Sequence, residues 1–155
     1  MIGNIKIIAV CMCKVYDERN YRIIRALNNF AVENDYRLFV YHTCSDLYWK
    51  TLSEKGEQSV FDLIDYNITD AVVTFEEGVY AENVMTKIRM DAAEYGKPVI
   101  SVGVEHDDCI SIKFGYAKGF EQVVRHVIEQ HGVRDIGFIA GRKDEENSEE
   151  RIAVF

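Results

Sequence analysis

Cysteine and histidine side chains fall close to the ends of the strands that the apolar pattern of this chain predicts. They are Cys13, His42, Cys44, His106 and Cys109. Thiolates and imidazoles from neighbouring loops can ligate zinc or another soft metal. The spacing of these residues matches no named zinc motif, however, and a buried cysteine commonly serves as a small apolar residue. No metal site is therefore assigned, and a metal or thiol enzyme of flavodoxin-like fold is kept as an alternative.

Aromatic and acidic side chains also follow two of the predicted strands. Tyr16 and Asp17 come after the first strand, and Phe75 and Glu76 stand at the end of the third. Loops that a rigid sheet holds in place are common sites of ligand binding, and an aromatic ring offers a stacking face to a small polar molecule. Asp17 also precedes a helical pattern, so its carboxylate is expected to cap that helix by accepting N–H groups of the first turn. These four residues are the candidate ligand contacts of the first half.

Several enzyme and nucleotide-binding motifs are absent from the sequence. It contains no G-x-G-x-x-G fingerprint, no P-loop and no G-x-S-x-G nucleophile elbow. A phospho-acceptor receiver domain needs an acidic cluster after the first strand and an Asp at the end of the third, where this chain has Cys13 and Thr74-Phe75-Glu76. We therefore expect no catalytic residues, no cofactor and no enzymatic activity of this chain.

The elements that must position these residues alternate between strands and helices. The apolar run from Ile5 to Val10, interrupted only by Lys6, is typical of a strand buried on both faces. Apolar residues spaced three and four apart from Tyr21 to Ala31, widened by Phe30, predict an amphipathic helix. Similar patterns predict strands at 38–41, 71–75, 98–102, 110–114 and 136–140, and helices around 53–64, 84–95 and 120–128.

This alternation predicts an α/β fold with a doubly wound parallel sheet and helices on both faces. Right-handed crossovers limit the topology to a few strand orders. In such sheets ligands bind outside the carboxyl ends of the strands, near the point where the strand order reverses. The loops after Cys13 and Phe75 are therefore the first places to look for a site.

The composition excludes other classes. A formal net charge of −8 argues against a large phosphate-binding surface, so no direct nucleic-acid contact is expected from this segment. The longest apolar runs are too short to cross a bilayer, and no secretory signal pattern opens the chain, so no membrane partner is expected. The four cysteines are expected to be reduced thiols of a cytoplasmic protein.

Four segments of the second half carry a family resemblance. They resemble four motifs of the lac-repressor/galactose-repressor sensor domains, in the same order and at nearly the same spacing. The segments are Pro98–Gly103, Gly119–Ile128, Arg134–Gly141 and Ser148–Phe155. In the first half, Asn34-Asp35-Tyr36 stands before a strand where these domains often have R-G-Y. The chain therefore resembles such a sensor domain over nearly its whole length.

The resemblance implies a two-lobed fold of the periplasmic-binding-protein type. Residues 1–114 would form lobe one, and residues 115–155 the first helix, strand and helix of a truncated lobe two. Arg151 matches the family arginine that reaches the ligand from lobe two, and its planar fork suits hydroxyl or carboxylate groups. Gly103 stands where many members have an Asp that accepts sugar hydroxyls, so an effector other than a standard sugar is expected.

The expected function is that of a small-molecule sensor. Closure of two lobes over a small polar effector would shift a homodimer interface and so gate an output module. The segments 41–49 and 149–155 resemble those of repressor-like sensors that are fused to diguanylate cyclase (GGDEF) modules. A GGDEF module is therefore the output module that we expect first. The alternatives are the effector-binding domain of a lac-repressor-type DNA-binding regulator, the metal or thiol enzyme, and a dimerisation module without a ligand.

Overall fold

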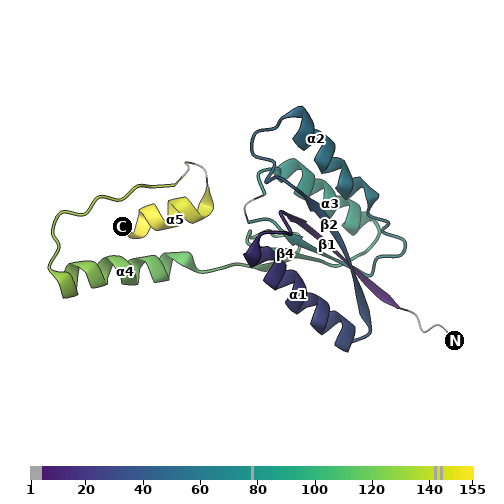
Figure 1. The fold of residues 1–155 in the computed structure, drawn as a ribbon, viewed down its shortest axis with the longest axis horizontal. Coiled ribbons are helices and arrows are strands. Elements are labelled where there is room, and N and C mark those ends of the chain that lie inside the picture. Colours follow the sequence, from purple (N-terminus) through teal and green to yellow (C-terminus); the bar gives the residue numbers. More distant parts are fainter. Residues whose placement is uncertain (1–4, 78, 142, 144) are drawn as a thin grey trace. The chain divides into compact units, whose positions relative to one another are not determined.

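The computed structural model of this chain describes residues 5–77, 79–141, 143 and 145–155. They form two compact units, of which the first ends at Lys113 and the second begins at Phe114 (Figure 1). Each unit is described by itself below. Whether the two units are the lobes of a hinged receptor stays a prediction.

A five-stranded sheet organises the first unit. All strand pairs are parallel and the order is β2-β1-β3-β4-β5, which confirms the predicted α/β fold with a doubly wound parallel sheet. β1 pairs with β2 over its whole length, from Lys6 opposite Tyr36 to Cys13 opposite Thr43. The strands are β1 (Lys6–Cys13), β2 (Tyr36–Thr43), β3 (Ala71–Phe75), β4 (Val99–Val102) and β5 (Ile110–Ile112).

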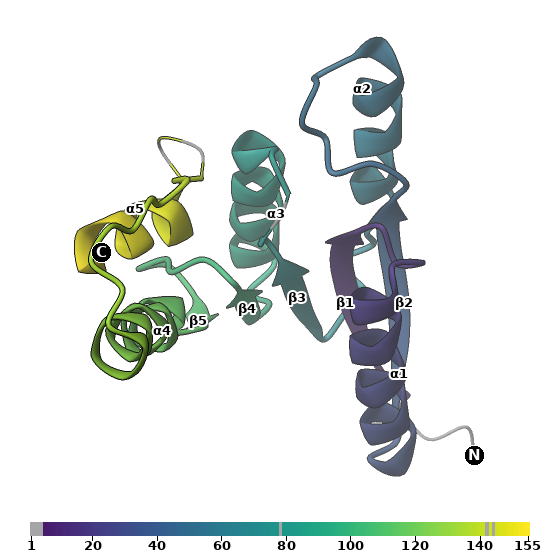
Figure 2. The ribbon, with the colours of Figure 1, turned by 60° about the vertical axis from the view of Figure 1, so that its left-hand side comes forward.

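The helices of the first unit cover both faces of this sheet. Figures 1 and 2 show α1 on one face and α2 and α3 on the other. This follows from right-handed crossovers, because the chain moves outward from β1 to β2 and then back past β1 to β3. The order therefore reverses between β1 and β3, which is the switch point. The helices are α1 (Glu18–Glu33), α2 (Leu52–Gln58), the 3-10 helix η1 (Ser59–Leu63) and α3 (Glu82–Glu94).

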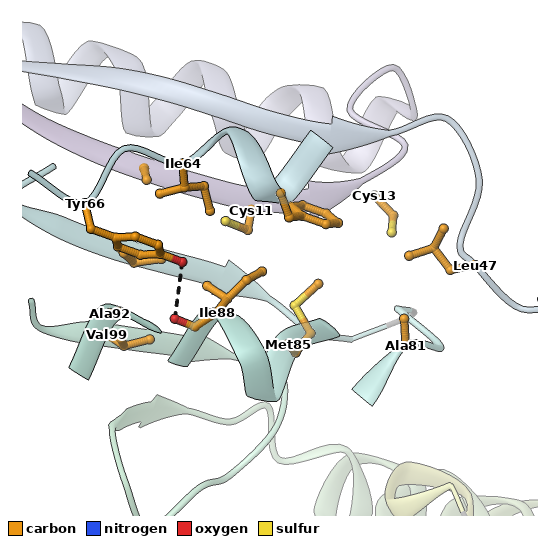
Figure 3. Close-up of a cluster of buried hydrophobic side chains, with 13 residues drawn as sticks. Cys11, Cys13, Leu47, Ile64, Tyr66, Ala81, Met85, Ile88, Ala92 and Val99 are labelled. Atoms are coloured by element: carbon orange, nitrogen blue, oxygen red, sulfur yellow. Dashed lines mark hydrogen bonds between the residues drawn. The ribbon is translucent and has the colours of Figure 1, made fainter. Parts of the chain in front are cut away.

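The main apolar core lies between one face of the sheet and the helices η1 and α3 that cover this face. Figure 3 shows Cys11 and Cys13 of β1 in the same buried cluster as Met85 and Ile88 of α3, with Cys13 beside Leu47. Alternate residues of β1 point to opposite faces, so Val10 and Met12 are buried toward α1 instead. Burial of β1 on both faces explains why its sequence is an almost unbroken apolar run.

Two expectations for α1 are wrong. The apolar pattern predicts that Tyr21 and Phe30 belong to its buried stripe, yet the structure leaves both more than half exposed. A helix that covers a sheet buries only a narrow stripe, and in α1 only Ala31 is fully buried. Asp17 occupies the N-cap position, but its side chain makes no capping hydrogen bond, and it is the Asp17 carbonyl that accepts the Tyr21 N–H.

The second unit contains α4 (Tyr116–His131) and α5 (Glu146–Val154), joined by a segment in which the described residues form no helix or strand. Gly132 ends α4 in the left-handed conformation, as its sequence predicts. Three aromatic rings, from Phe120, Phe138 and Phe155, form a small apolar cluster in this unit, with centroids 4.9–6.4 Å apart.

The strand predicted at 136–140 is not formed. This segment lies in no ladder, because the described residues of the second unit supply no other strand with which it could pair. Its apolar pattern is that of a strand, and Ile139 is left almost fully exposed.

Among the described residues, no helix is both long and apolar enough to pass through a lipid bilayer.

Candidate functional site

The loops after β1 and β3 meet at the switch point of the sheet. Lys14 continues from β1 with a positive φ of 48°, and its N–H donates to the Thr43 carbonyl at 2.7 Å. The Asn20 side chain of α1 donates to the carbonyls of Cys13 and Lys14 at 3.0 and 3.1 Å. These bonds fix the turn that leads from the sheet to Tyr16 and Asp17.

Two ion pairs tie these loops to their neighbours. The Lys14 ammonium lies 2.9 Å from a carboxylate oxygen of Asp46, which follows β2. The hydrogen bond from Lys14 lowers the pKa of Asp46 and raises that of Lys14. Arg19 of α1 lies 2.8 Å from the Glu77 carboxylate, which follows β3. Both pairs are partly open to solvent, so they orient the loops more than they stabilise the fold.

A buried ionic cluster lies next to these loops, at the carboxyl ends of the strands. Glu76, Arg89 and His106 come from the end of β3, from α3 and from the loop after β4. Arg89 Nη1 lies 3.0 and 3.1 Å from the two oxygens of Glu76, and His106 Nε2 lies 2.9 Å from Glu76 Oε2. The side chains of Glu76 and Arg89 are only 6% and 7% exposed. Both charges are therefore removed from water and depend on each other for compensation.

Hydroxyl groups and a further carboxylate complete the cluster. Thr74 donates to Glu76 Oε1 at 2.8 Å, and Arg89 Nη2 donates to the Thr86 hydroxyl at 3.2 Å. The buried Arg89 Nε has no hydrogen bond, but it lies 3.5 Å from Asp108 Oδ1. The Ser111 hydroxyl accepts the His106 N–H at 3.0 Å. The cluster thus joins α3 to the ends of β3, β4 and β5.

Aromatic rings form an open surface after β2. Tyr48 contacts Trp49 and Tyr80 edge to face, with centroids 4.7 and 5.2 Å apart. Trp49 is 76% exposed, so its face is available to a ligand. The Glu57 carboxylate holds the start of this loop, because one of its oxygens accepts the N–H groups of Cys44 and Ser45 at 2.9 Å.

The thiols of β1 are poorly suited to nucleophilic chemistry. Burial raises the pKa of Cys13 to about 11 and raises that of Cys11 still further. A thiol is reactive as its thiolate, so both are inert near neutral pH. Within the described ranges, no group of three or more His, Cys, Asp or Glu side chains lies close enough to hold a metal ion. All four cysteines are free thiols in the structure.

These thiols lead to two predictions, one for their reactivity and one for the pH dependence of stability. Iodoacetamide at mildly alkaline pH is expected to alkylate the exposed Cys44 and to leave Cys11 and Cys13 unmodified, as measured by peptide mass spectrometry. The Cys13 thiol contributes to stability in full below the unfolded-state pKa of about 8.5, and this contribution is lost as the pH rises through the folded value of about 11. Alkylation of Cys13 as fast as Cys44 in the native protein would contradict this.

The structure places the predicted site residues in four settings. Tyr16 is 80% exposed and its ring contacts His42 edge to face, while Asp17 is exposed beside it in sequence. Phe75 is half-buried at the end of β3, opposite Val102 of β4. Glu76 lies in the buried cluster. Arg151 belongs to α5 of the second unit, where its Nε donates to the Asn147 carbonyl at 2.8 Å.

Sequence reasoning missed Arg89, Lys14 and Asp46. For Arg89 a signal was present: it stands four residues after Met85 and three before Ala92, inside the buried stripe of α3. A charged residue on the buried face of a helix implies a buried partner of opposite charge. Lys14 and Asp46 offered no such signal, because charged loop residues are usually solvated.

A separate hollow lies between η1 and α3. Its volume is about 300 Å³, and Phe61, Asp62, Val84 and Lys87 belong to its lining. None of the five predicted site residues lines it. We therefore centre the candidate site on the strand ends, where the topology and the polar side chains coincide.

Comparison with known proteins supports the fold. No protein-family model and no curated protein matches the chain. A solved structure of the lac repressor dimer bound to operator and the anti-inducer ONPF is similar to 96% of this chain, with a TM-score of 0.64 and 13% identity. An uncharacterized protein from Actinobacillus succinogenes is similar to 97% of it, with a TM-score of 0.61 and 17% identity.

These identities show a shared fold alone. The chain spans 42% of the lac repressor chain and 51% of the Actinobacillus chain. The predicted α/β fold with a parallel sheet, similar to that of the lac repressor, is thereby confirmed, whereas the division into two lobes stays a prediction.

Proposed function

We propose that this chain is the small-molecule-sensing region of a bacterial signalling or transcription-regulatory protein. Its small polar effector would bind at the carboxyl ends of β1 and β3. The observation that carries the proposal is the gathering of charged and aromatic side chains at the switch point of a sheet whose fold the lac repressor shares. The lac repressor structure was solved with the anti-inducer ONPF bound.

Two of the proposed contacts are suited to direct recognition. Tyr16 offers an exposed ring and Asp17 an exposed carboxylate that no helix cap occupies. Together they can stack on a ligand and accept its hydroxyl or ammonium protons. Phe75 would add apolar contact. The contact of Arg151 with the effector stays a prediction from the resemblance.

Glu76 has a different part in this proposal. Both of its oxygens accept hydrogen bonds from within the protein, so it is a positioning residue in the conformation described. Through Arg89 and His106 it holds the ends of β3 and β4 against α3. The adjacent Glu77, which forms an ion pair with Arg19, is the carboxylate that lies at the strand ends instead.

The full-length protein would act as a homodimer, in which closure of two lobes over the effector gates an output module. An effector can bias this equilibrium only by binding the closed form more tightly than the open form. We propose a diguanylate cyclase (GGDEF) module as the output, so that any catalysis belongs to that module and this chain is not an enzyme.

A second candidate is the effector-binding domain of a DNA-binding transcriptional regulator. The observation that favours it is that the similar lac repressor is a dimer bound to operator DNA. The coding sequence on both sides of this segment distinguishes the two outputs. A helix-turn-helix before it would support the regulator, and a cyclase signature after it would support the GGDEF output.

A thermal-shift screen against a metabolite library tests the sensing proposal. A ligand of the native state must raise its stability, so at least one compound is expected to raise the melting temperature. For that compound, Tyr16→Ala, Asp17→Asn and Arg151→Ala are each expected to weaken binding about tenfold or more, as measured by calorimetry. Tyr21→Ala is the matched control, since Tyr21 is another exposed tyrosine of the same region.

The proposal fails if no compound stabilises the protein. It also fails if the first two variants bind the compound as the native protein does. Unchanged binding by Arg151→Ala alone would remove only that residue from the site.

A further inference from the structure

Two histidine rings meet at the carboxyl end of α4. The Nε2 atoms of His126 and His131 lie 3.1 Å apart, and the rings are nearly perpendicular, with centroids 4.9 Å apart. Both residues are exposed. Residues five apart are not neighbours on one face of a regular helix, so this contact depends on His131 being the last helical residue before the left-handed Gly132.

The separation of the two nitrogens matches that of two ligands on one metal ion. Imidazole nitrogens that bind a metal at about 2.1 Å, with an angle of roughly 95–110° between them, lie about 3.1–3.4 Å apart. We propose that His126 and His131 form a two-ligand site for a divalent late transition-metal ion such as Ni²⁺, Cu²⁺ or Zn²⁺. Water would complete the coordination, since both rings face solvent.

The electrostatic setting favours a cation at this place. The carboxyl end of a helix carries partial negative charge, and α4 is 16 residues long. The positive charge next to His126 is matched, because Arg125 pairs with Glu121 at 2.9 Å and with Glu129 at 3.4 Å. Neutral imidazole suits the late first-row metals, whose affinity for such ligands rises toward Cu²⁺.

The other two histidines of the chain have different partners. His106 Nε2 contacts the Glu76 carboxylate, and the ring of His42 contacts Tyr16. His42 therefore offers a matched control, being a single partly exposed imidazole. The proposed metal site is independent of effector sensing at the strand ends, so the two proposals fail separately.

Calorimetric titration of the whole chain with NiCl2 tests the site. One Ni²⁺ per chain is expected, and His126→Gln and His131→Gln are each expected to weaken its binding about tenfold or more, whereas His42→Gln leaves it unchanged. Ni²⁺ should also raise the melting temperature of the native protein, but not that of a double variant that carries both His126→Gln and His131→Gln. No measurable Ni²⁺ binding, or binding that both substitutions leave intact, would overturn the proposal.

Discussion

Replacement of Arg89 by methionine is expected to destabilise the first unit by about 3–5 kcal/mol, because it leaves the Glu76 carboxylate buried without its countercharge. Methionine keeps much of the length of the arginine side chain, so the loss reports on charge more than on volume. Urea unfolding followed by circular dichroism and by the fluorescence of Trp49, the one tryptophan of the chain, measures the change.

Lys87 provides the matched control on the same helix. Its ammonium lies 3.0 Å from Asp62 and 3.1 Å from Asp91, but Lys87 and Asp62 are well exposed and Asp91 is only partly buried. Lys87→Met is therefore expected to cost only about 0–1 kcal/mol. Equal losses for the two variants would mean that the cluster around Glu76 is solvated in solution and is not a buried ionic network.

A double variant separates the pair from its surroundings. Glu76→Gln combined with Arg89→Met removes both charges, so it is expected to be less destabilised than Arg89→Met alone. The result bears on function as well, since the same two residues hold the strand ends at which the effector is proposed to bind. An additive outcome would indicate that each residue acts through other partners.

The strands of the first unit are predictable because burial on both faces leaves a strong pattern. The run from Ala71 to Phe75 was predicted to its last residue, and the parallel arrangement follows from the alternation of strands with helices. The segment 136–140 has an equally good pattern but forms no ladder. A strand is completed by hydrogen bonds to a neighbour, and no local pattern states whether that neighbour is present.

The candidate site is less predictable than the fold. Topology alone directs attention to the loops after β1 and β3, where Tyr16, Asp17 and Glu76 lie. Topology does not tell which carboxylate is accessible to a ligand and which is already hydrogen-bonded within the protein. That distinction depends on contacts between residues 13 and 30 positions apart, namely Arg89 and His106 with Glu76. Such contacts become visible only when the packing of α3 is known.

Gly103→Ala is expected to destabilise the first unit by about 2–4 kcal/mol, because Gly103 adopts a φ of +103° that side-chain-bearing residues rarely reach. An added Cβ would also lie 2.6 Å from Glu77 Cβ and 2.9 Å from the Glu77 nitrogen. The loops after β3 and β4 must therefore separate to accept it. Urea unfolding measures the cost.

Gly56→Ala is the control for this substitution, and its effect should have the opposite sign. Gly56 lies within α2 and has open space where a Cβ would be added, so alanine is expected to stabilise by about 0.5–1 kcal/mol. Native-like stability of Gly103→Ala would contradict the close approach of the two loops. Glu77 also pairs with Arg19, so the close contact between Gly103 and Glu77 fixes the position of the Glu77 carboxylate at the strand ends. Separation of the two loops should therefore weaken effector binding as well as lower stability.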